Sequence, residues 1–303
     1  MLRISVVIVT YNSAKAVNAC LEALAQQRCE IVVVDNASQD DTVQRVQAFV
    51  ARQDLRLLVN DRNLGFARAV NQGVRETSGD ILLALNPDAI AEPGAVQALL
   101  QCLESTHAAA AAGALLDSDG KPARGFTFRR LPTLSTLLCE TMLVNQLWPQ
   151  NPVNRRYRCL DADYSKQQEV EQPAGACLAI TRKAWELIGG FDESFYPVWF
   201  EDVDLCKRLL QSGGKIVYCP AARFRHGGAH SVSQLSLLQK QAFWYINMLG
   251  YARKHLAGPQ VRILRAGIIA GMLLRSFAAL FGIRSAPLSE TLSAYWEVAR
   301  KVR

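Results

Sequence analysis

The chain has 303 residues, half of them hydrophobic and 20% charged, with a formal net charge of +7. This is enough to bury a substantial core, as one large domain or two, and the composition excludes a disordered chain. The eight cysteines form no C-x-x-C pair. This argues against zinc and redox-pair proteins and favours isolated buried thiols in a reducing compartment. The N-terminus is too short for a secretory signal, so we expect Ile4–Val9 to be the first core strand.

The positive charge is concentrated at the C-terminal end. Residues 251–303 hold nine basic and two acidic side chains, which accounts for the whole net charge and leaves the rest neutral. Charge confined to one end does not indicate nucleic-acid binding, and we expect none. The apolar runs Ala266–Leu274 and Phe277–Ile283 are each shorter than the roughly 18 residues that span a bilayer. Two interpretations stay open: these helices lie on an anionic membrane surface, or they pack as a hairpin on the protein or a second subunit.

The first third of the chain alternates β-branched apolar runs with helical patterns. Strands are predicted at Ile4–Val9, Ile31–Val34, Leu55–Val59 and Ile81–Leu85, and helices at Ala14–Gln26, Asp40–Ala51 and Ala67–Glu76. Strands buried on both faces and joined by helical crossovers predict an α/β fold with a mostly parallel sheet. In such sheets ligands bind beyond the carboxyl ends of the strands.

Polar side chains follow three of these predicted strands. They are Thr10, Tyr11 and Asn12, then Asp35, Asn36 and Ser38, then Asn86 and Asp88. Helix capping explains one side chain at each turn, but not Tyr11 beside Asn12 together with Asp35 beside Asn36. A carboxylate accepts the imide proton of uracil or thymine, and an aromatic ring offers a stacking face. These residues therefore predict a nucleotide site.

The residue after the fourth predicted strand indicates a cation. A carboxylate at Asp88 can hold Mg²⁺ or Mn²⁺ against phosphate oxygens. The first strand is followed by no G-x-G-x-x-G, and the chain contains no Walker motif, which argues against dinucleotide-binding and P-loop proteins.

Several ordered motifs carry a family resemblance. They are Ser5–Asn12, Val33–Ser38, Asn63–Asn71 and Asn86–Asp88, followed by Gly189–Asp192, Phe200–Cys206 and His226–Ser231. Over residues 3–231 the chain resembles family 2 glycosyltransferases, most strongly their rhamnosyltransferase-like branch. The resemblance implies a GT-A (nucleotide-diphospho-sugar transferase) fold and inversion of the anomeric centre. We expect residues 1–115 to bind the nucleotide sugar, residues 116–240 to form the acceptor-binding and catalytic half, and residues 241–303 to form a C-terminal helical extension.

The resemblance also implies roles for residues of the donor site. The nucleotide pocket would contain Thr10, Tyr11, Asn12, Asp35 and Asn36. Asp88 matches the last position of the family's D-x-D metal motif, whose first position is here Asn86. Asparagine is a weaker, neutral ligand, so Asp88 would carry most of the coordination while Asn86 orients ribose or phosphate. Arg68 would reach the diphosphate or, alternatively, is an exposed helix charge.

The segment Trp199–Leu210 indicates the catalytic base. It is an aromatic loop entering an amphipathic helix, and three acidic residues in four positions exceed what the helix dipole requires. Displacement at an anomeric carbon needs a base for the acceptor hydroxyl proton. In the family the base is the Asp of this Glu-Asp pair, here Asp202. Glu201 would orient the acceptor, and Asp204 would serve the helix or a nearby arginine.

Two further residues complete the predicted site. The resemblance makes His226 a third metal ligand, a role that suits neutral imidazole. Trp199 is either an acceptor platform, because sugars pack against indole, or part of the core. His230 is given no role.

These observations predict an inverting, metal-dependent glycosyltransferase that uses a dTDP- or UDP-sugar, with rhamnose favoured by the resemblance. The acceptor would be a hydroxyl of a glycan or polyprenyl-linked glycan in surface polysaccharide synthesis. We expect a cytoplasmic protein, peripheral at the inner face of the plasma membrane, and an oligomer stays open. The alternatives are a sugar-phosphate nucleotidylyltransferase, which would need a Gly-rich basic phosphate loop, and a catalytically silent module that binds glycans or membrane surfaces.

Overall fold

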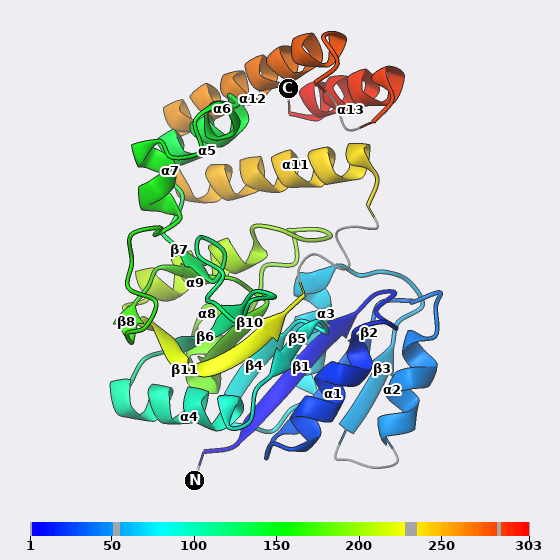
Figure 1. Ribbon diagram of the computed structural model, residues 1–303, viewed down its shortest axis with the longest axis vertical. Helices are drawn as coiled ribbons and strands as arrows, with labels where there is room; N and C mark the ends of the chain where they lie inside the picture. The colour runs from blue at the N-terminus through cyan, green and yellow to red at the C-terminus, as the bar shows by residue number, and fades with distance from the viewer. Residues whose placement is uncertain (1, 51–54, 228–234, 284–285, 303) are drawn as a thin grey trace.

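The computed structural model describes residues 2–50, 55–227, 235–283 and 286–302 (Figure 1). The strands are β1 (Ile4–Thr10), β2 (Glu30–Asp35), β3 (Leu55–Val59), β4 (Ile81–Leu85), β5 (Ala89–Ala91), β6 (Ala110–Leu116), β7 (Phe128–Arg129), β8 (Gln168–Glu169), β9 (Gln172–Pro173), β10 (Cys177–Thr181) and β11 (Ile216–His226). The main sheet has the order β3-β2-β1-β4-β10-β6-β11-β5, with β8 also paired to β11. β7 and β9 form a separate two-stranded sheet.

Most strands of the main sheet run in one direction. β1 is parallel to β2 and β4, β2 to β3, and β6 to β11. β10 is antiparallel to both β4 and β6. Its first residue, Cys177, is therefore opposite Leu85, the last residue of β4. As a result, the segment that enters β10 lies at the same edge as the carboxyl ends of β1, β2 and β4.

Helices cover both faces of the sheet. They are α1 (Val17–Ala25), α2 (Thr42–Val50), α3 (Phe66–Arg75), α4 (Ala95–Thr106), α8 (Arg182–Ile188) and α9 (Glu201–Gln211). One core cluster joins the sheet to α1, α2 and α4, and a second joins it to α3, α8 and α9. In β4, Leu83 and Leu85 belong to the first cluster and Leu82 to the second. This explains why the strand is an unbroken apolar run.

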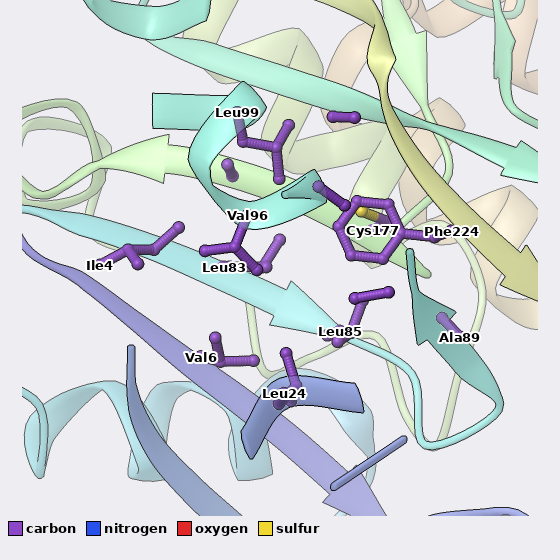
Figure 2. Close-up of a cluster of buried hydrophobic side chains, with 14 of the residues drawn as sticks. Ile4, Val6, Leu24, Leu83, Leu85, Ala89, Val96, Leu99, Cys177 and Phe224 are labelled. Atoms are coloured by element: carbon purple, nitrogen blue, oxygen red, sulfur yellow. The ribbon is translucent and has the colours of Figure 1, made fainter. Parts of the chain in front are cut away.

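The first cluster shows how tightly the layers pack. Leu83 and Leu85 of β4 lie with Val96 and Leu99 of α4 and with Phe224 of β11 (Figure 2). On the other face, a Cβ at Gly73 of α3 would lie 2.5 Å from Cγ1 of Val7 in β1. A glycine inside a helix costs stability relative to alanine, and here the close approach of helix and strand requires it.

The fold class predicted from the sequence is confirmed, and the predicted elements deviate only at their ends. β3 and β4 have the predicted bounds, whereas α1 begins at Val17 instead of Ala14. The carbonyl of Ser13 accepts hydrogen bonds from the backbone N–H groups of Ala16 and Val17, so a turn precedes the helix. All eight cysteines are free. Five of them are buried as predicted, whereas Cys29, Cys139 and Cys159 are only partly buried.

The C-terminal part consists of helices that pack on the sheet domain. α11 (Leu237–His255), α12 (Gly258–Leu280) and α13 (Leu288–Lys301) form a third core with α5 (Leu134–Thr141). The shorter helices α6 (Val144–Leu147) and α7 (Pro152–Tyr157) follow α5. Phe200 and Val203 of the sheet domain also belong to this third core. The extension therefore packs on the rest of the chain, while the boundaries predicted at residues 115 and 240 remain predictions.

The prediction of two short apolar runs in this extension was wrong. The helix α12 has 23 residues and contains the whole first run and the second run as far as Leu280. By length and composition alone, it is long and apolar enough to cross a membrane. Arg275 does not interrupt the helix, because its buried guanidinium donates hydrogen bonds to the carbonyls of Thr141, Glu140 and Gly271. Such a helix is weak evidence for a membrane span, since the core helices of soluble proteins meet the same criterion.

A buried ion-pair network joins α9 to α11. Asp204 is fully buried and lies 2.8 Å from Arg208 Nε, as the sequence predicted for a nearby arginine. The other carboxylate oxygen lies 2.8 Å from Lys254 Nζ and 2.7 Å from His255 Nε2 at the end of α11. One carboxylate therefore connects α9 of the sheet domain to the helical extension.

We expect Asp204→Ala to lower the free energy of unfolding by about 3–5 kcal/mol, because it leaves the largely buried Arg208 guanidinium without its carboxylate partner and removes the hydrogen-bond partner of the buried His255 ring. Urea denaturation followed by tryptophan fluorescence measures this loss. Glu297→Ala is the matched control, since Glu297 pairs with Arg300 and Lys301 on the surface of α13 and should contribute little. Equal losses for the two variants would contradict the role given to Asp204.

Candidate active site

The predicted nucleotide residues meet at the ends of β1 and β2. Thr10 Oγ1 donates a hydrogen bond to Asp35 Oδ1 at 2.7 Å, and Ser38 Oγ donates to the same oxygen at 2.6 Å. The backbone N–H of Ser38 donates to Asp35 Oδ2 at 2.8 Å. Three donors thus fix the orientation of this buried carboxylate at the carboxyl edge of the sheet.

The neighbouring amide side chains hold loops in place. Asn12, in a left-handed backbone conformation (φ 48°), accepts a hydrogen bond from Gln39 N at 2.7 Å. Asn36 Nδ2 donates to the carbonyl of Gly65 at 3.2 Å, and its Oδ1 accepts from Asn60 at 3.1 Å. The side chain of Tyr11, between these loops, is partly exposed. These contacts shape the pocket, and direct contact of Tyr11, Asn12 and Asn36 with a nucleotide remains a prediction.

The predicted metal ligands lie together at the far side of the same edge. Asp88 precedes β5, and His226 ends β11, which pairs with β5 in a register that puts His226 opposite Ala89. His226 Nε2 lies 3.3 Å from Asp88 Oδ1, and both side chains are largely buried. The His226 ring stacks on Phe126 with a centroid distance of 5.2 Å and an interplanar angle of 18°. The ring is thereby fixed with Nε2 toward the carboxylate.

The chemistry of this pair fits a divalent cation. Within the described part of the chain, the buried Nε2 of His226 has no hydrogen-bond partner, a condition that costs about 1–3 kcal/mol. An imidazole nitrogen beside a carboxylate oxygen is a donor set that Mn²⁺ or Mg²⁺ accepts. Among the described residues no group of three or more His, Cys, Asp or Glu is placed to hold a metal. The protein would therefore supply two ligands and leave other positions to phosphate or water.

Asp202 is fixed at the start of α9 by backbone donors. Its Oδ2 accepts hydrogen bonds from Gly175 N at 3.0 Å and from Gln172 Nε2 at 3.4 Å, and its Oδ1 accepts from Val203 N at 2.8 Å. A Cβ at Gly175 would lie 3.2 Å from Cβ of Asp202, so glycine permits the close approach. Asp202 as a whole residue is partly exposed, and these three donors fix the orientation of its carboxylate.

Burial changes the proton affinity of both acids in this pair. It raises the pKa of Asp202 above its ordinary value, although the N–H donors of Gly175 and Val203 and the charge of Arg129 act in the opposite direction. Burial, with the adjacent Asp202 charge, raises the pKa of Glu201 well above its ordinary value. In the described structure, Glu201 Oε2 is buried without a hydrogen-bond partner. Perturbed acids of this kind are common at active sites.

The loop before α9 stores backbone strain. Trp199 (φ 78°) and Phe200 (φ 71°) both have left-handed conformations, which are costly for bulky residues. Both rings pack edge-on against Trp244 of α11, at 5.5 and 5.3 Å. Trp199 also lines a cavity of about 270 Å³ with Lys240 and Trp244. It thus packs on the core and borders a cavity, and its contact with an acceptor remains a prediction.

Residues 174–176, which lead into β10, join the turn that contains Asn86 and Asp88 to Asp202. The backbone N–H of Gly175 donates a hydrogen bond to the Asp202 carboxylate. The carbonyl of the next residue, Ala176, accepts a hydrogen bond from Asn86 N at 3.0 Å. Asn86 and Asp88 belong to one turn after β4. The predicted metal ligand and the predicted base therefore flank the segment that enters β10.

Sequence reasoning missed several residues of this site. Gly175 and Gln172 hold Asp202, Phe126 stacks on His226, and the charge of Arg129 lowers the pKa of Asp202. They lie on short segments without helical or strand periodicity. The available signal was compositional: arginines and aromatic residues recur around residues 124–130.

Two predicted residues need separate mention. Arg68 lies on the exposed face of α3, with Nε 3.6 Å from Glu193 Oε2, and its contact with a diphosphate remains a prediction. His230, which was given no role, lies outside the described residues, as do Gly228 and Ser231 of the same motif.

Solved structures share this architecture across the whole chain. The mannosyltransferase PcManGT from Pyrobaculum calidifontis, in complex with GDP-Man and Mn²⁺, has a TM-score of 0.56 at 18% identity, covering 99% of this chain and 86% of that chain. GalNAc-T7 with UDP, GalNAc and Mn²⁺ has a TM-score of 0.59 at 16% identity, covering 98% of this chain and 54% of that chain. The fold is therefore the GT-A fold of glycosyltransferases.

Sequence comparison places the chain within this class. The profile of glycosyl transferase family 2 matches residues 5–165, and that of the N-terminal domain of galactosyltransferase matches residues 155–230. N-acetylglucosaminyl-diphospho-decaprenol L-rhamnosyltransferase of Mycobacterium tuberculosis is 33% identical over 245 residues, covering 76% of this chain and 77% of the relative. Rhamnosyltransferase WbbL of Escherichia coli K12 is 25% identical, covering 58% of this chain and 62% of the relative. The chain belongs to glycosyl transferase family 2 and is a glycosyltransferase.

Proposed function

We propose that this glycosyltransferase transfers a sugar with inversion, with Asp202 as the base. One observation carries the proposal: the carboxylate of Asp202, whose pKa is raised, is held by Gly175 beside the turn that bears Asp88. A base of this kind accepts the proton of the acceptor hydroxyl as its oxygen attacks the anomeric carbon from the side opposite the leaving nucleotide diphosphate. A single displacement inverts that carbon.

The donor is a nucleotide diphosphate sugar, and we favour dTDP-rhamnose. Asp35 lies where it can accept the imide proton of thymine or uracil through its Oδ2, which has one protein donor among the described residues. The two rhamnosyltransferase relatives support rhamnose as the sugar. Thr10 orients the carboxylate of Asp35. Asn12 and Asn36 shape the pocket, and Tyr11 offers its ring for stacking with the nucleobase.

A divalent cation, Mg²⁺ or Mn²⁺, belongs to the proposed reaction. When bound, it would neutralise the charge that develops on the leaving diphosphate. Asp88 and His226 would hold it, and Asn86 in the same turn would orient ribose or phosphate. This assignment is supported by the unpartnered Nε2 of His226 beside Asp88 and by the Mn²⁺ in solved structures of the same fold.

The acceptor is a lipid-linked glycan of surface polysaccharide synthesis, and the protein works at the inner face of the membrane. The relative from Mycobacterium tuberculosis is named for an acceptor sugar linked through diphosphate to decaprenol. A neutral sheet domain with a basic helical end is compatible with such a substrate. The alternative of a nucleotidylyltransferase is disfavoured because the first strand is followed by Thr10-Tyr-Asn12 rather than a basic Gly-rich loop.

We infer that the exposed face of α12 binds the membrane. Leu273, Phe277 and Leu280 are 65%, 63% and 58% exposed, and Phe281 just beyond the helix is 71% exposed. This face belongs to a segment with nine basic and two acidic residues. Apolar side chains beside basic ones fit an anionic lipid surface, whereas two copies of so basic a segment would repel each other.

Replacing the base tests the mechanism. We expect Asp202→Asn to lower kcat about 10²- to 10⁴-fold while the donor still binds, because an amide accepts no proton. In the wild type, the rate of transfer should fall as the pH decreases through the raised pKa of Asp202. This fall should occur at a pH above 3.8, the pKa of an ordinary aspartate. Initial rates across pH, with calorimetric titration of donor into the variant, measure both. Retained turnover in Asp202→Asn would exclude Asp202 as the base.

Replacing a ligand tests the metal site. Transfer should stop in EDTA and return with Mn²⁺ or Mg²⁺, and Asp88→Ala should raise the Mn²⁺ concentration for half-maximal rate at least about tenfold, because one of two protein ligands is lost. Asp119→Asn is the control, since that carboxylate lies on an exposed loop. Full activity in EDTA, or equal Mn²⁺ requirements for the two variants, would contradict the assignment.

The membrane face is tested by vesicle sedimentation. Wild-type protein should sediment with phosphatidylglycerol vesicles and be released by alkaline carbonate, and Phe277→Ser with Phe281→Ser should weaken binding about tenfold through lost apolar burial. Leu187→Ser, which removes a 69% exposed leucine from α8, is the control. Resistance to carbonate would indicate a spanning helix instead. A dimer that the double variant dissociates would assign this face to a second copy.

A further inference from the structure

A second basic region lies between β6 and β8. Residues 121–158 hold seven basic side chains and one acidic side chain, although the chain outside the C-terminal segment is neutral in total. Arg129, Arg130, Arg155 and Arg156 line one cavity of about 560 Å³. Arg130 and Arg156 also line a second cavity of about 470 Å³. The excess charge is thus gathered around connected hollows of the surface.

The carboxylates at the first cavity are already paired. Glu171 accepts a hydrogen bond from Leu131 N at 2.8 Å and lies 3.5 Å from Arg130. Asp161 pairs with Arg155, and Glu169 pairs with Lys215 at 2.8 Å.

Two arginines at this cavity have no carboxylate partner. In the described part of the chain, Arg129 bonds only the carbonyl of Gly125, and no ion pair with a carboxylate forms at Arg156. Arginine side chains that line a cavity and form no ion pair with its carboxylates favour an anion with several oxygens, such as a diphosphate.

Arg129 connects this cavity to the active site. Its guanidinium lies 6.0 Å from the ring centroid of Phe126, which stacks on His226, and 5.8 Å from that of Tyr157 in α7. In the β7–β9 pair Arg129 is opposite Gln172, the residue that donates to Asp202. An anion in this cavity would therefore contact Arg129, the arginine whose charge acts on Asp202.

Exposed apolar side chains lie on α6 and at its C-terminal end. Leu147 of α6 and the next residue, Trp148, are 84% and 58% exposed. α5, which borders the second cavity, packs on α12. Figure 1 shows α5, α6 and α7 at the same end of the molecule as α12, away from the N-terminus. A lipid chain leaving the cavity would meet apolar side chains on its path to the exposed face of α12.

We propose that the Arg129–Arg156 cavity binds the diphosphate of a lipid-linked acceptor. The acceptor sugar then extends toward Asp202, and the lipid lies across α6 toward α12. This inference rests on the proposed transferase function and adds an acceptor subsite to it. The site differs from the donor's, because the predicted donor ligands lie at the ends of β1, β2 and β4 and none of them lines this cavity.

Direct binding tests the cavity without catalysis. Farnesyl diphosphate is titrated calorimetrically into the full chain in EDTA, so that no metal assists, with dTDP present to fill the donor pocket. Arg156→Gln should raise Kd about tenfold, the effect of losing one charge-assisted contact. Arg158→Gln, whose side chain bonds Asn154 at 3.1 Å and lines neither cavity, should leave Kd unchanged. Equal Kd values for the wild type and Arg156→Gln would overturn the proposal.

Kinetics supplies the second test. The same acceptor sugar is offered on a farnesyl diphosphate and on an uncharged octyl group. In Arg156→Gln the ratio of the two KM values should rise about tenfold, because only the charged acceptor uses the arginine. An unchanged ratio would overturn the proposal. If the wild type transfers sugar to neither acceptor, the proposed function fails, and the calorimetric titration still decides whether the cavity binds a lipid diphosphate.

Discussion

Between β4 and β6, strand β10 runs antiparallel to both neighbours, so the segment that enters it lies at the carboxyl edge of an otherwise mostly parallel sheet. Gly175 and Ala176 of that segment bond Asp202 on one side and the turn of Asn86 on the other. The separation of the proposed base from the proposed metal pair thus depends on a few backbone hydrogen bonds. A side chain at Gly175 would displace this junction.

The half of the fold built from local patterns could be predicted from the sequence. β3 and β4 have the predicted bounds, because an apolar run between turn residues needs no distant partner to be recognised. The reversed direction of β10 could not be predicted, since strand direction depends on long-range pairing. α12 was divided wrongly at Arg275 because a charge usually marks a surface. Here the charge is buried, and its donors are satisfied by carbonyls of α5 that the sequence could not place nearby.

The candidate site also contains some residues that could be predicted from the sequence and others that could not. Asp35, Asp88, Asp202 and His226 could be predicted because ordered motifs surround them; their roles remain predictions, and the structure brings Asp88 and His226 within 3.3 Å. Gly175, Gln172 and Phe126 were missed because each acts through position alone. The basic cavity was missed because whole-chain charge hid it. Residues 121–158 are strongly basic, and acidic residues elsewhere in the sequence cancel that charge in the sum.

The features that reduce stability gather at one edge of the sheet. His226 Nε2 and Glu201 Oε2 are buried without partners in the described structure, and Trp199 and Phe200 have costly backbone conformations. Each such feature costs about 1–3 kcal/mol. The rest of the fold offsets this cost through two apolar layers on the sheet and the Asp204 network, which fixes α9 four residues beyond Phe200. Because a bound ligand can satisfy buried polar groups that lack a partner, the position of these costs supports the proposed site.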